Sequence, residues 1–225
     1  MLFGNFVGFI NSYSDFGTIK ISGGEPFYND SIKYFLQYAK NKNKKTEVLS
    51  CGNYESGPIP KKVLDECAPF LDRIMFSIYG NKETHNKICR KNNAWQNLER
   101  TIKYCEELKI PFKFETVAMP GVSLDEIFNY IGKLKSEKLS LKVMHLILQG
   151  KAENIEYFSS KKIYEFKEKA EKLGKEFNIP VKFSCSLEGK CLADSEKKAI
   201  VIVDNRPKIV NCSALKYSNK KKCKD

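Results

Sequence analysis

Two kinds of apolar spacing alternate along this chain, and their succession predicts alternating helices and strands. Apolar residues three or four positions apart are typical of a helix with one buried face, whereas short alternating or continuous apolar runs are typical of strands. The predicted helices cover residues 2–13, 29–41, 60–71, 94–109, 123–134 and 163–177. The predicted strands cover residues 18–22, 47–54, 73–80, 111–119, 141–148 and 179–185.

A helix separates each predicted strand from the next, and this order determines how the strands pair. Parallel neighbours need a crossover of about a dozen residues or more, which is usually a helix. The sequence therefore predicts an α/β fold with a parallel sheet, arranged as an open or closed barrel or as a doubly wound sheet. In these architectures function gathers at the carboxyl ends of the strands.

The pattern changes after residue 183. The stretch "AIVIVDNRPKIVNC", residues 199–212, contains two apolar runs separated by a polar turn over Asp204 to Pro207, which predicts a β-hairpin. We therefore expect two units: an α/β domain over residues 1–183 and a small cysteine-rich extension over residues 184–225.

Three smaller predictions concern single side chains. Ser123 and Glu126 have the spacing of a capping box at a helix start. His85 follows the strand at 73–80 and is predicted to be a loop or helix-cap residue. His145 is flanked by apolar residues on a strand and is predicted to be a core histidine, able to face the barrel interior, with a substrate contact as the alternative.

Composition agrees with a folded domain, since 42% of the 225 residues are apolar. No apolar run approaches the roughly eighteen residues of a membrane-spanning helix. The first residues lack the positively charged start and the cleavage site of a signal peptide. We expect a cytoplasmic protein without a membrane partner.

The net charge of +12 allows a nucleic-acid partner. Only four of the 39 basic residues are arginine, however, and bidentate contacts to bases and phosphates favour arginine. The lysines are scattered over the predicted helices, and the densest basic cluster lies near the end of the chain, at 220–224. Nucleic-acid binding stays an alternative that the composition does not favour.

The predicted strands end in small polar residues, as in "SGGEP", "SCGNY" and "FSIYG". The first of these contains Gly23 and Gly24, directly after the strand at 18–22. Paired glycines allow an ordinary turn, but they also allow backbone groups to be exposed to a ligand without side chains in the way. Local sequence leaves both interpretations open.

Eight cysteines are present, and four of them fall within the last forty-one residues. A hairpin flanked by cysteines is a usual way to hold a metal or a cluster, although four unrelated thiols remain an alternative. Spacing does not separate zinc from iron–sulfur, because both accept four thiolates. The predicted metal ligands are Cys185, Cys191, Cys212 and Cys223.

The strand ends "ISGGEP" and "LSCGNY", followed by "FSIYGNKETHNKICRKNNAWQNLERTIKYCEELKI", resemble the radical S-adenosylmethionine (radical SAM) superfamily. The hairpin with "VNCSALK" resembles the SPASM or twitch-like extension of one of its branches. The likeness covers roughly residues 5–216. It implies a partial (β/α)6 barrel related to the TIM barrel, without its first strand, which leaves the strand before Gly23 as a sheet edge.

The resemblance also implies cofactors and site residues. S-adenosylmethionine would meet the Gly-Gly-Glu element with its ammonium group, and a four-iron four-sulfur cluster would occupy an auxiliary site in the extension, with zinc as the alternative. Ser77 would face the cofactor from the neighbouring strand, while Asn53 and Arg90 are weaker candidates. The implied cofactor-binding residues are Gly23, Gly24, Glu25, Pro26, Asn53, Ser77 and Arg90.

One family feature is missing from this sequence. The superfamily holds its primary cluster with a Cys-x3-Cys-x2-Cys loop after the first barrel strand, and here no cysteine precedes Cys51. Without the electron from that cluster the sulfonium bond would not be cleaved. We therefore expect either an N-terminally incomplete copy of an enzyme that modifies a peptide or small metabolite with a reductant protein, or a degenerate member that binds a metal or a partner.

Overall fold

The computed structural model of this chain describes residues 3–13, 16–55, 57–136, 138–146 and 156–188, and the backbone of 199–203 and 206–210. Its helices are α1 (Phe3–Ser12), α2 (Ile32–Asn41), α3 (Lys61–Cys67), α4 (Lys82–Cys89), α5 (Ala94–Glu107), α6 (Leu124–Ile131) and α7 (Ser160–Glu176). Its strands are β1 (Thr18–Ile21), β2 (Lys45–Ser50), β3 (Asn53–Tyr54), β4 (Gly57–Pro58), β5 (Arg73–Ser77), β6 (Phe112–Ala118), β7 (Leu141–His145), β8 (Val181–Phe183), β9 (Ala199–Val203) and β10 (Arg206–Val210).

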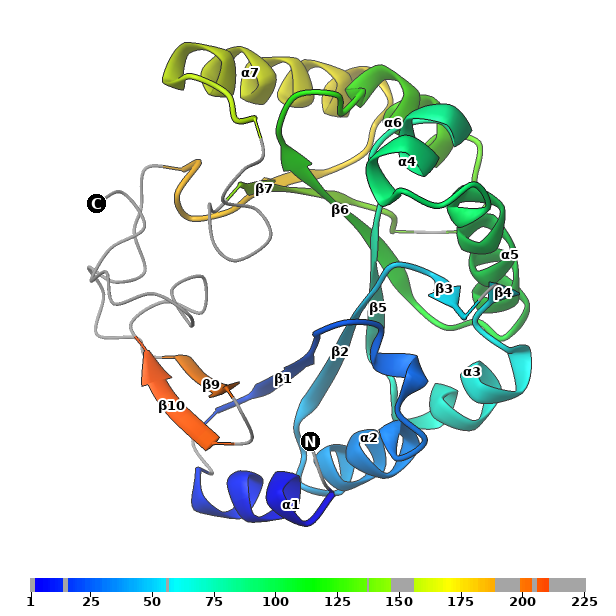
Figure 1. The fold of residues 1–225 in the computed structure, drawn as a ribbon, viewed down its shortest axis with the longest axis vertical. Coiled ribbons are helices and arrows are strands. Elements are labelled where there is room, and N and C mark those ends of the chain that lie inside the picture. The colour runs from blue at the N-terminus through cyan, green and yellow to red at the C-terminus, as the bar shows by residue number, and fades with distance from the viewer. Residues whose placement is uncertain are drawn as a thin grey trace.

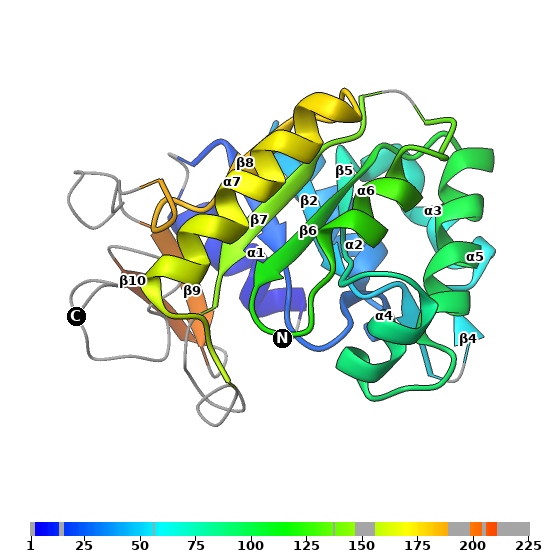
Figure 2. The same cartoon turned by 90° about the horizontal axis from the view of Figure 1, so that it is seen from above.

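Six of these strands form one parallel sheet in the order β1-β2-β5-β6-β7-β8. The sheet curves, and the helices lie around its outer side (Figure 1). Seen from above, α7 runs along β7 and β8 (Figure 2). This arrangement confirms the predicted α/β fold, a partial TIM-barrel-like sheet. The strand β1 pairs only with β2 among the described strands, so it forms the expected edge.

Residue alternation gives the sheet two chemically different faces, because successive strand side chains point to opposite sides. The outer face packs against the helices with apolar side chains such as Ile74 and Phe76 of β5 and Phe112 and Phe114 of β6. Each is almost fully buried. The opposite face, which we call the inner face, carries the residues between them.

A second, smaller apolar cluster lies at the β1 edge. It consists of Phe6 and Ile10 of α1, Ile19 of β1, and Phe35 and Ala39 of α2. Phe6 stacks on Phe35 with ring centroids 4.8 Å apart. The helix α1 is therefore attached to the barrel through a cluster that is separate from the main core.

The predicted elements match the observed ones, with differences at their ends. The strand predicted at 47–54 is shorter, because the chain turns at Gly52, with φ +71°, and continues as the short β3–β4 ladder. The helix α4 was not predicted. The predicted hairpin is confirmed, since β9 and β10 pair antiparallel as a separate two-stranded sheet, with Arg206 and Pro207 already in β10 rather than in the turn.

Two of the smaller predictions are wrong. Ser123 is the N-cap of α6, but its side chain makes no capping hydrogen bond. The other half of the box is also missing, because the Glu126 carboxylate accepts hydrogen bonds at the start of α4 and the Ser123 N–H donates to the Tyr79 carbonyl. His85 lies within α4 and is fully buried. The third prediction, for His145, differs in the face of the sheet. His145 is half-buried on β7, on the same side as Leu141 and Val143, so it faces the helices rather than the barrel interior.

No helix within the described part of the chain is both long and apolar enough to cross a membrane.

Candidate functional site

The carboxyl ends of β1, β2 and β5 are neighbours at one edge of the sheet, because these strands pair in that order. The loop after β1 contains the Gly-Gly-Glu-Pro element, the loop after β2 begins at Cys51, and β5 ends at Ser77. The register of β2 and β5 pairs Ser50 with Phe76, so Ser77 lies level with the start of the β2 loop.

The Gly23–Gly24 turn exposes its backbone to open space. Gly23 has φ +107° and Gly24 has φ +53°, values that favour glycine. A Cβ atom added at either residue would meet no heavy atom of the described residues within 4 Å. The turn therefore presents main-chain groups without side chains in the way, as a ligand-binding turn requires.

Glu25 joins the loops after β1 and β2. Its buried carboxylate accepts hydrogen bonds from the Ser50 hydroxyl, 2.9 Å from each oxygen, and from the Cys51 backbone N–H at 2.9 Å. It also accepts from the Cys51 thiol at 3.0 Å and the Phe27 N–H at 3.3 Å. These contacts hold the preceding Gly23–Gly24 turn against the end of β2.

The Glu25–Cys51 contact is nonetheless a site of electrostatic strain. Burial raises the pKa of Glu25 above its ordinary value, and the hydrogen bonds from Cys51, Ser50 and Phe27 only partly offset this. Burial and the adjacent Glu25 carboxylate raise the pKa of the Cys51 thiol to about 12. Cys51 therefore remains a protonated donor to Glu25 at neutral pH rather than a nucleophile.

The remaining predicted residues occupy different surroundings. Pro26 is buried in the first turn of a 3₁₀ helix, Pro26–Tyr28, whose N-cap is Glu25. Ser77 is half-exposed on the inner face, beside the side chain of Tyr79. The structure thus brings Ser77 to the same edge as Gly23, Gly24 and Glu25.

Asn53 and Arg90 are less favourably placed for a cofactor. The Asn53 amide donates to the Cys51 carbonyl at 2.9 Å, and its oxygen accepts from Asn97 at 3.0 Å, so both groups are engaged inside the fold. Arg90 ends α4 with φ +55° and an exposed side chain. Both remain predictions that rest on the resemblance alone.

Ser50 and Cys51 were not assigned a role from the sequence. The sequence signal that could have found them is their position at the end of a predicted strand. In the sheet, this strand lies beside β1, which the Gly-Gly-Glu loop follows. Their function here is to position Glu25.

The predicted metal ligands fall largely outside the described residues. Cys185 lies half-buried in the turn after β8, whereas Cys191, Cys212 and Cys223 are not among the residues that the structure describes. Within the described part, no group of three or more His, Cys, Asp or Glu side chains is arranged to hold a metal ion. The auxiliary metal site stays a prediction.

The four cysteines of the first half of the chain are free thiols. Burial raises the pKa of Cys67 to about 12 and that of Cys89 to about 11, and it raises the pKa of Cys105 further. Cys67, Cys89 and Cys105 are therefore protonated at neutral pH, and we assign these three to packing.

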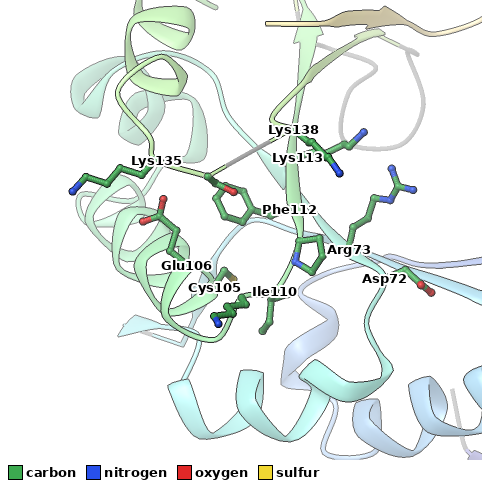
Figure 3. Close-up of a pocket in the computed structure, with 12 residues that line it drawn as sticks. Asp72, Arg73, Cys105, Glu106, Ile110, Phe112, Lys113, Lys135 and Lys138 are labelled. Atoms are coloured by element: carbon green, nitrogen blue, oxygen red, sulfur yellow. The ribbon is translucent and has the colours of Figure 1, made fainter.

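A cavity of about 930 Å³ lies at the opposite edge of the sheet, at the amino ends of β5, β6 and β7 (Figure 3). Its lining residues include Arg73, Glu106, Lys113, Lys135 and Lys138. It shares no residue with the Gly23–Ser77 edge and is a separate feature of the molecule.

Comparisons with known proteins identify the family and the fold of this chain. The Radical SAM superfamily family model matches residues 10–134, more than half of the chain. A comparison with curated proteins gave no match.

Several solved structures share the fold. Streptococcus suis SuiB bound to precursor peptide SuiA has 14% sequence identity and a TM-score of 0.74, with 97% of this chain and 54% of that chain covered. The protein anSMEcpe, with bound AdoMet and Kp18Cys peptide, has 15% identity and a TM-score of 0.65, with 99% and 68% covered.

A radical SAM methyltransferase from Sphaerobacter thermophilus has 19% identity and a TM-score of 0.55, with 76% of this chain and 52% of that chain covered. The chain thus spans about half the length of SuiB and of the methyltransferase. The shared fold and the Gly-Gly-Glu turn at the carboxyl ends of the strands agree with this family match. This chain therefore belongs to the radical SAM superfamily.

Proposed function

We propose that this chain binds S-adenosylmethionine at the carboxyl edge of β1, β2 and β5, and that it serves in the modification of a peptide. Membership of the superfamily implies S-adenosylmethionine and an iron–sulfur cluster. Solved structures with the same fold contain AdoMet and peptides. The observation that carries the proposal is the open Gly23–Gly24 turn, held in place by the Glu25 carboxylate.

In this proposal the backbone carbonyls of the Gly23–Gly24 turn accept hydrogen bonds from the cofactor ammonium, a compact cation with three donors. Ser77 offers a hydroxyl group from the neighbouring strand. Glu25 acts mainly as a positioning residue, because its carboxylate is already occupied by Ser50, Cys51 and Phe27. Arg90 and Asn53 remain the weaker candidates.

The iron–sulfur cluster fits the described residues less well than S-adenosylmethionine does. When bound, such a cluster supplies the reducing electron for cleavage of the sulfonium C–S bond. The described residues bring no three thiolates together, and no cysteine precedes Cys51 in this sequence. We therefore propose radical chemistry only for a protein in which a Cys-x3-Cys-x2-Cys loop completes the site, with a reductant protein as electron source.

The proposal includes the extension at residues 184–225 and a cytoplasmic location, because thiolates stay reduced there. Its four cysteines, Cys185, Cys191, Cys212 and Cys223, would hold an auxiliary four-iron four-sulfur cluster or a zinc ion. Iron, sulfide and zinc contents after anaerobic purification decide between the two.

A second candidate function is a non-catalytic binding module. It is favoured by the same lack of three converging thiolates among the described residues. The two candidates differ in one measurable product, 5′-deoxyadenosine. We expect no 5′-deoxyadenosine from this chain after reduction. We expect 5′-deoxyadenosine from a fusion that supplies the cysteine loop. Failure of a cluster-loaded fusion to form it would favour the non-catalytic module.

Binding of S-adenosylmethionine by the full chain, measured by isothermal titration calorimetry, tests the proposal directly. The Gly24→Ala variant should fold with a loss of about 1–2 kcal/mol, because its backbone is left-handed but its surroundings are open. We expect its affinity for the cofactor to fall about tenfold or more, because the methyl group enters the ligand space.

The exposed Gly8 of α1, also in open space, provides the control through Gly8→Ala. This variant should bind as the unmodified chain does. A chain that does not bind S-adenosylmethionine, or a Gly24→Ala variant with unchanged affinity, would show that the turn is not the cofactor site.

A further inference from the structure

The inner face of the six-stranded sheet carries an excess of positive charge. Residue alternation places six basic side chains and only two carboxylates on this face, and at least one basic residue comes from every strand. The basic residues are Lys20, Lys45, Arg73, Lys113, Lys142 and Lys182, and the carboxylates are Glu47 and Glu115.

Both carboxylates are already paired. Glu47 lies between Lys20 and Arg73 in the register of β1, β2 and β5, and it contacts each of them at 3.0 Å. Glu115 contacts Lys142 at 3.4 Å. Neither carboxylate is left to balance the other cations of the face.

Lys113 and Lys182 are the uncompensated cations near the centre and the β8 side of the face. Lys182 is directly opposite Lys142 in the parallel register, and like charges in this position are destabilising. Neither Lys113 nor Lys182 makes an ion pair within 4.0 Å to any residue that the structure describes. Burial, Arg73 and Lys182 together lower the pKa of Lys113, with Glu47 acting in the opposite direction.

The positive charge continues beyond the face. Arg73 and Lys113 also line the cavity at the amino ends of β5–β7, where Lys109, Lys135 and Lys138 add further ammonium groups (Figure 3). Asp72 and Glu106 also line this cavity, so the positive charge is only partly balanced there. Excess like charge lowers stability, and such arrangements are frequent at binding sites.

We propose that the inner face binds an extended acidic segment of the peptide substrate, with Lys113 and Lys182 as its main carboxylate-binding residues. This inference rests on the proposed function in peptide modification. It adds that the bound segment of the peptide is negatively charged.

Dimensions favour an extended chain over a single anionic group. Five strand spacings of about 4.8 Å separate β1 from β8, which gives roughly 24 Å along the curved sheet. An extended peptide of about seven residues has this length, and its alternate side chains, about 7 Å apart, point to one side. A compact phosphate would favour converging arginines, but the one arginine here, Arg73, already pairs with Glu47.

The composition of the face argues against nucleic acid. Single-stranded nucleic acid binds on grooves where aromatic side chains stack on the bases. The inner positions of the six strands contain no aromatic residue, and their apolar members are Leu49, Met75, Val117 and Met144. These lie nearer the carboxyl ends of their strands, so an apolar residue of the peptide would pack between the acidic segment and the cofactor edge.

Fluorescence anisotropy with two labelled ten-residue peptides, one with Glu at alternate positions and one with Gln there, tests the proposal on the full chain. No S-adenosylmethionine or iron is needed. We expect the Glu peptide to bind about tenfold tighter than the Gln peptide, and its affinity to fall as salt is raised. The double variant Lys113→Gln, Lys182→Gln should lose about tenfold for the Glu peptide only.

The matched control removes the same charge from the outside of the molecule. Lys161 and Lys172 are exposed on α7, and the double variant Lys161→Gln, Lys172→Gln should change the affinity less than about twofold. If the inner-face double variant does not fold, the exposed Lys182→Gln alone should lose about threefold.

Equal binding of the two peptides, or an equal loss in the α7 control, would overturn the proposal. A single-stranded RNA that binds tighter than the Glu peptide and is lost in the inner-face variant would assign the face to nucleic acid instead. Because the assay contains no cofactor, a chain that binds the Glu peptide but not S-adenosylmethionine refutes the proposed function alone, and the reverse result refutes this inference alone.

Discussion

At the scale of single residues, His85 is the titratable group most altered by burial on α4. Its ring is completely buried between Tyr79 and Trp95, with centroids 5.5 and 5.7 Å away. Its Nε2 lies 3.4 Å from the Cys89 sulfur, and its Nδ1 has no hydrogen-bond partner among the described residues. Burial lowers the pKa of His85 to about 4.

This pKa makes the stability of the fold sensitive to acid. The unfolded chain takes up the His85 proton near pH 6.5 and the folded chain only near pH 4, so between these values the unfolded state binds more protons. The free energy of unfolding should therefore fall by about 2 kcal/mol between pH 7 and pH 5, as measured by urea denaturation. In His85→Phe, which keeps the ring packing, most of this fall should disappear. An equal fall in both proteins would contradict the assignment.

Glu25 shows what the sequence could and could not predict about the site. The "SGGEP" pattern correctly indicated a break at a strand end, because glycine pairs and a proline are readable in one dimension. The direction of the Glu25 carboxylate was not readable, since its partners Ser50 and Cys51 come from the next strand, 25 and 26 residues away. Only the hydrogen bonds of the folded structure show that Glu25 positions the turn.

At the scale of elements, α4 depends on a contact from another helix. Glu126 of α6 accepts hydrogen bonds from the Asn81 N–H at 2.9 Å, the Asn81 side-chain amide at 2.7 Å and the Thr84 hydroxyl at 2.9 Å. Asn81 in turn caps α4 by accepting from the Thr84 N–H at 3.0 Å. Gly80 must be glycine here, because a Cβ atom would lie 2.6 Å from a Glu126 oxygen.

Removal of this contact should loosen α4 selectively. We expect Glu126→Ala to lower the free energy of unfolding by about 2 kcal/mol, because the first-turn donors of α4 lose their acceptor. Hydrogen exchange should speed up in α4 and not in β5 or β6. Asp125→Ala, which removes an exposed ion pair with Lys169 from the same turn of α6, should cost about 0.5 kcal/mol without loosening α4. Slow exchange in α4 of Glu126→Ala would show that the contact does not support the helix.

The same contact explains why α4 was missing from the sequence-based prediction. Helices were recognised by an apolar stripe, and α4 buries only His85. Its stability comes from a cap and from a glutamate 45 residues away from Asn81. The capping-box prediction for Ser123 failed for the same reason, because it assigned the Glu126 side chain to its own helix.

At the scale of the whole molecule, the alternation of helix and strand patterns was sufficient to predict the barrel. Each outer strand face is a nearly continuous set of buried residues, such as Phe112, Phe114, Thr116 and Ala118 on β6, and the pattern shows this directly. The inner face was not predicted. Its charges come from every strand of the sheet, and their proximity depends on strand order and register, which the sequence does not encode locally.

The separation of the two apolar clusters predicts that α1 can unfold locally while the main core stays folded. Because α1 contacts the rest through the cluster of Phe6, Ile10, Ile19, Phe35 and Ala39, its loss leaves the main core intact. Phe6→Ala removes a buried ring stacked on Phe35, a change of about 3 kcal/mol in local stability. Amide exchange in α1 should then speed up about a hundredfold, whereas amides of β5 and β6 keep their rates.

Phe114→Ala is the matched control for this prediction, since it removes the same side chain from the main core, where Phe114 is fully buried on β6. It should lower the global stability by about 3–5 kcal/mol and speed exchange throughout the sheet. If Phe6→Ala accelerates β5 and β6 as much as α1, the two clusters unfold together and the edge strand β1 is held by the main core. The selective result would instead identify α1 and β1 as the part of the barrel that opens first, next to the Gly23–Gly24 turn.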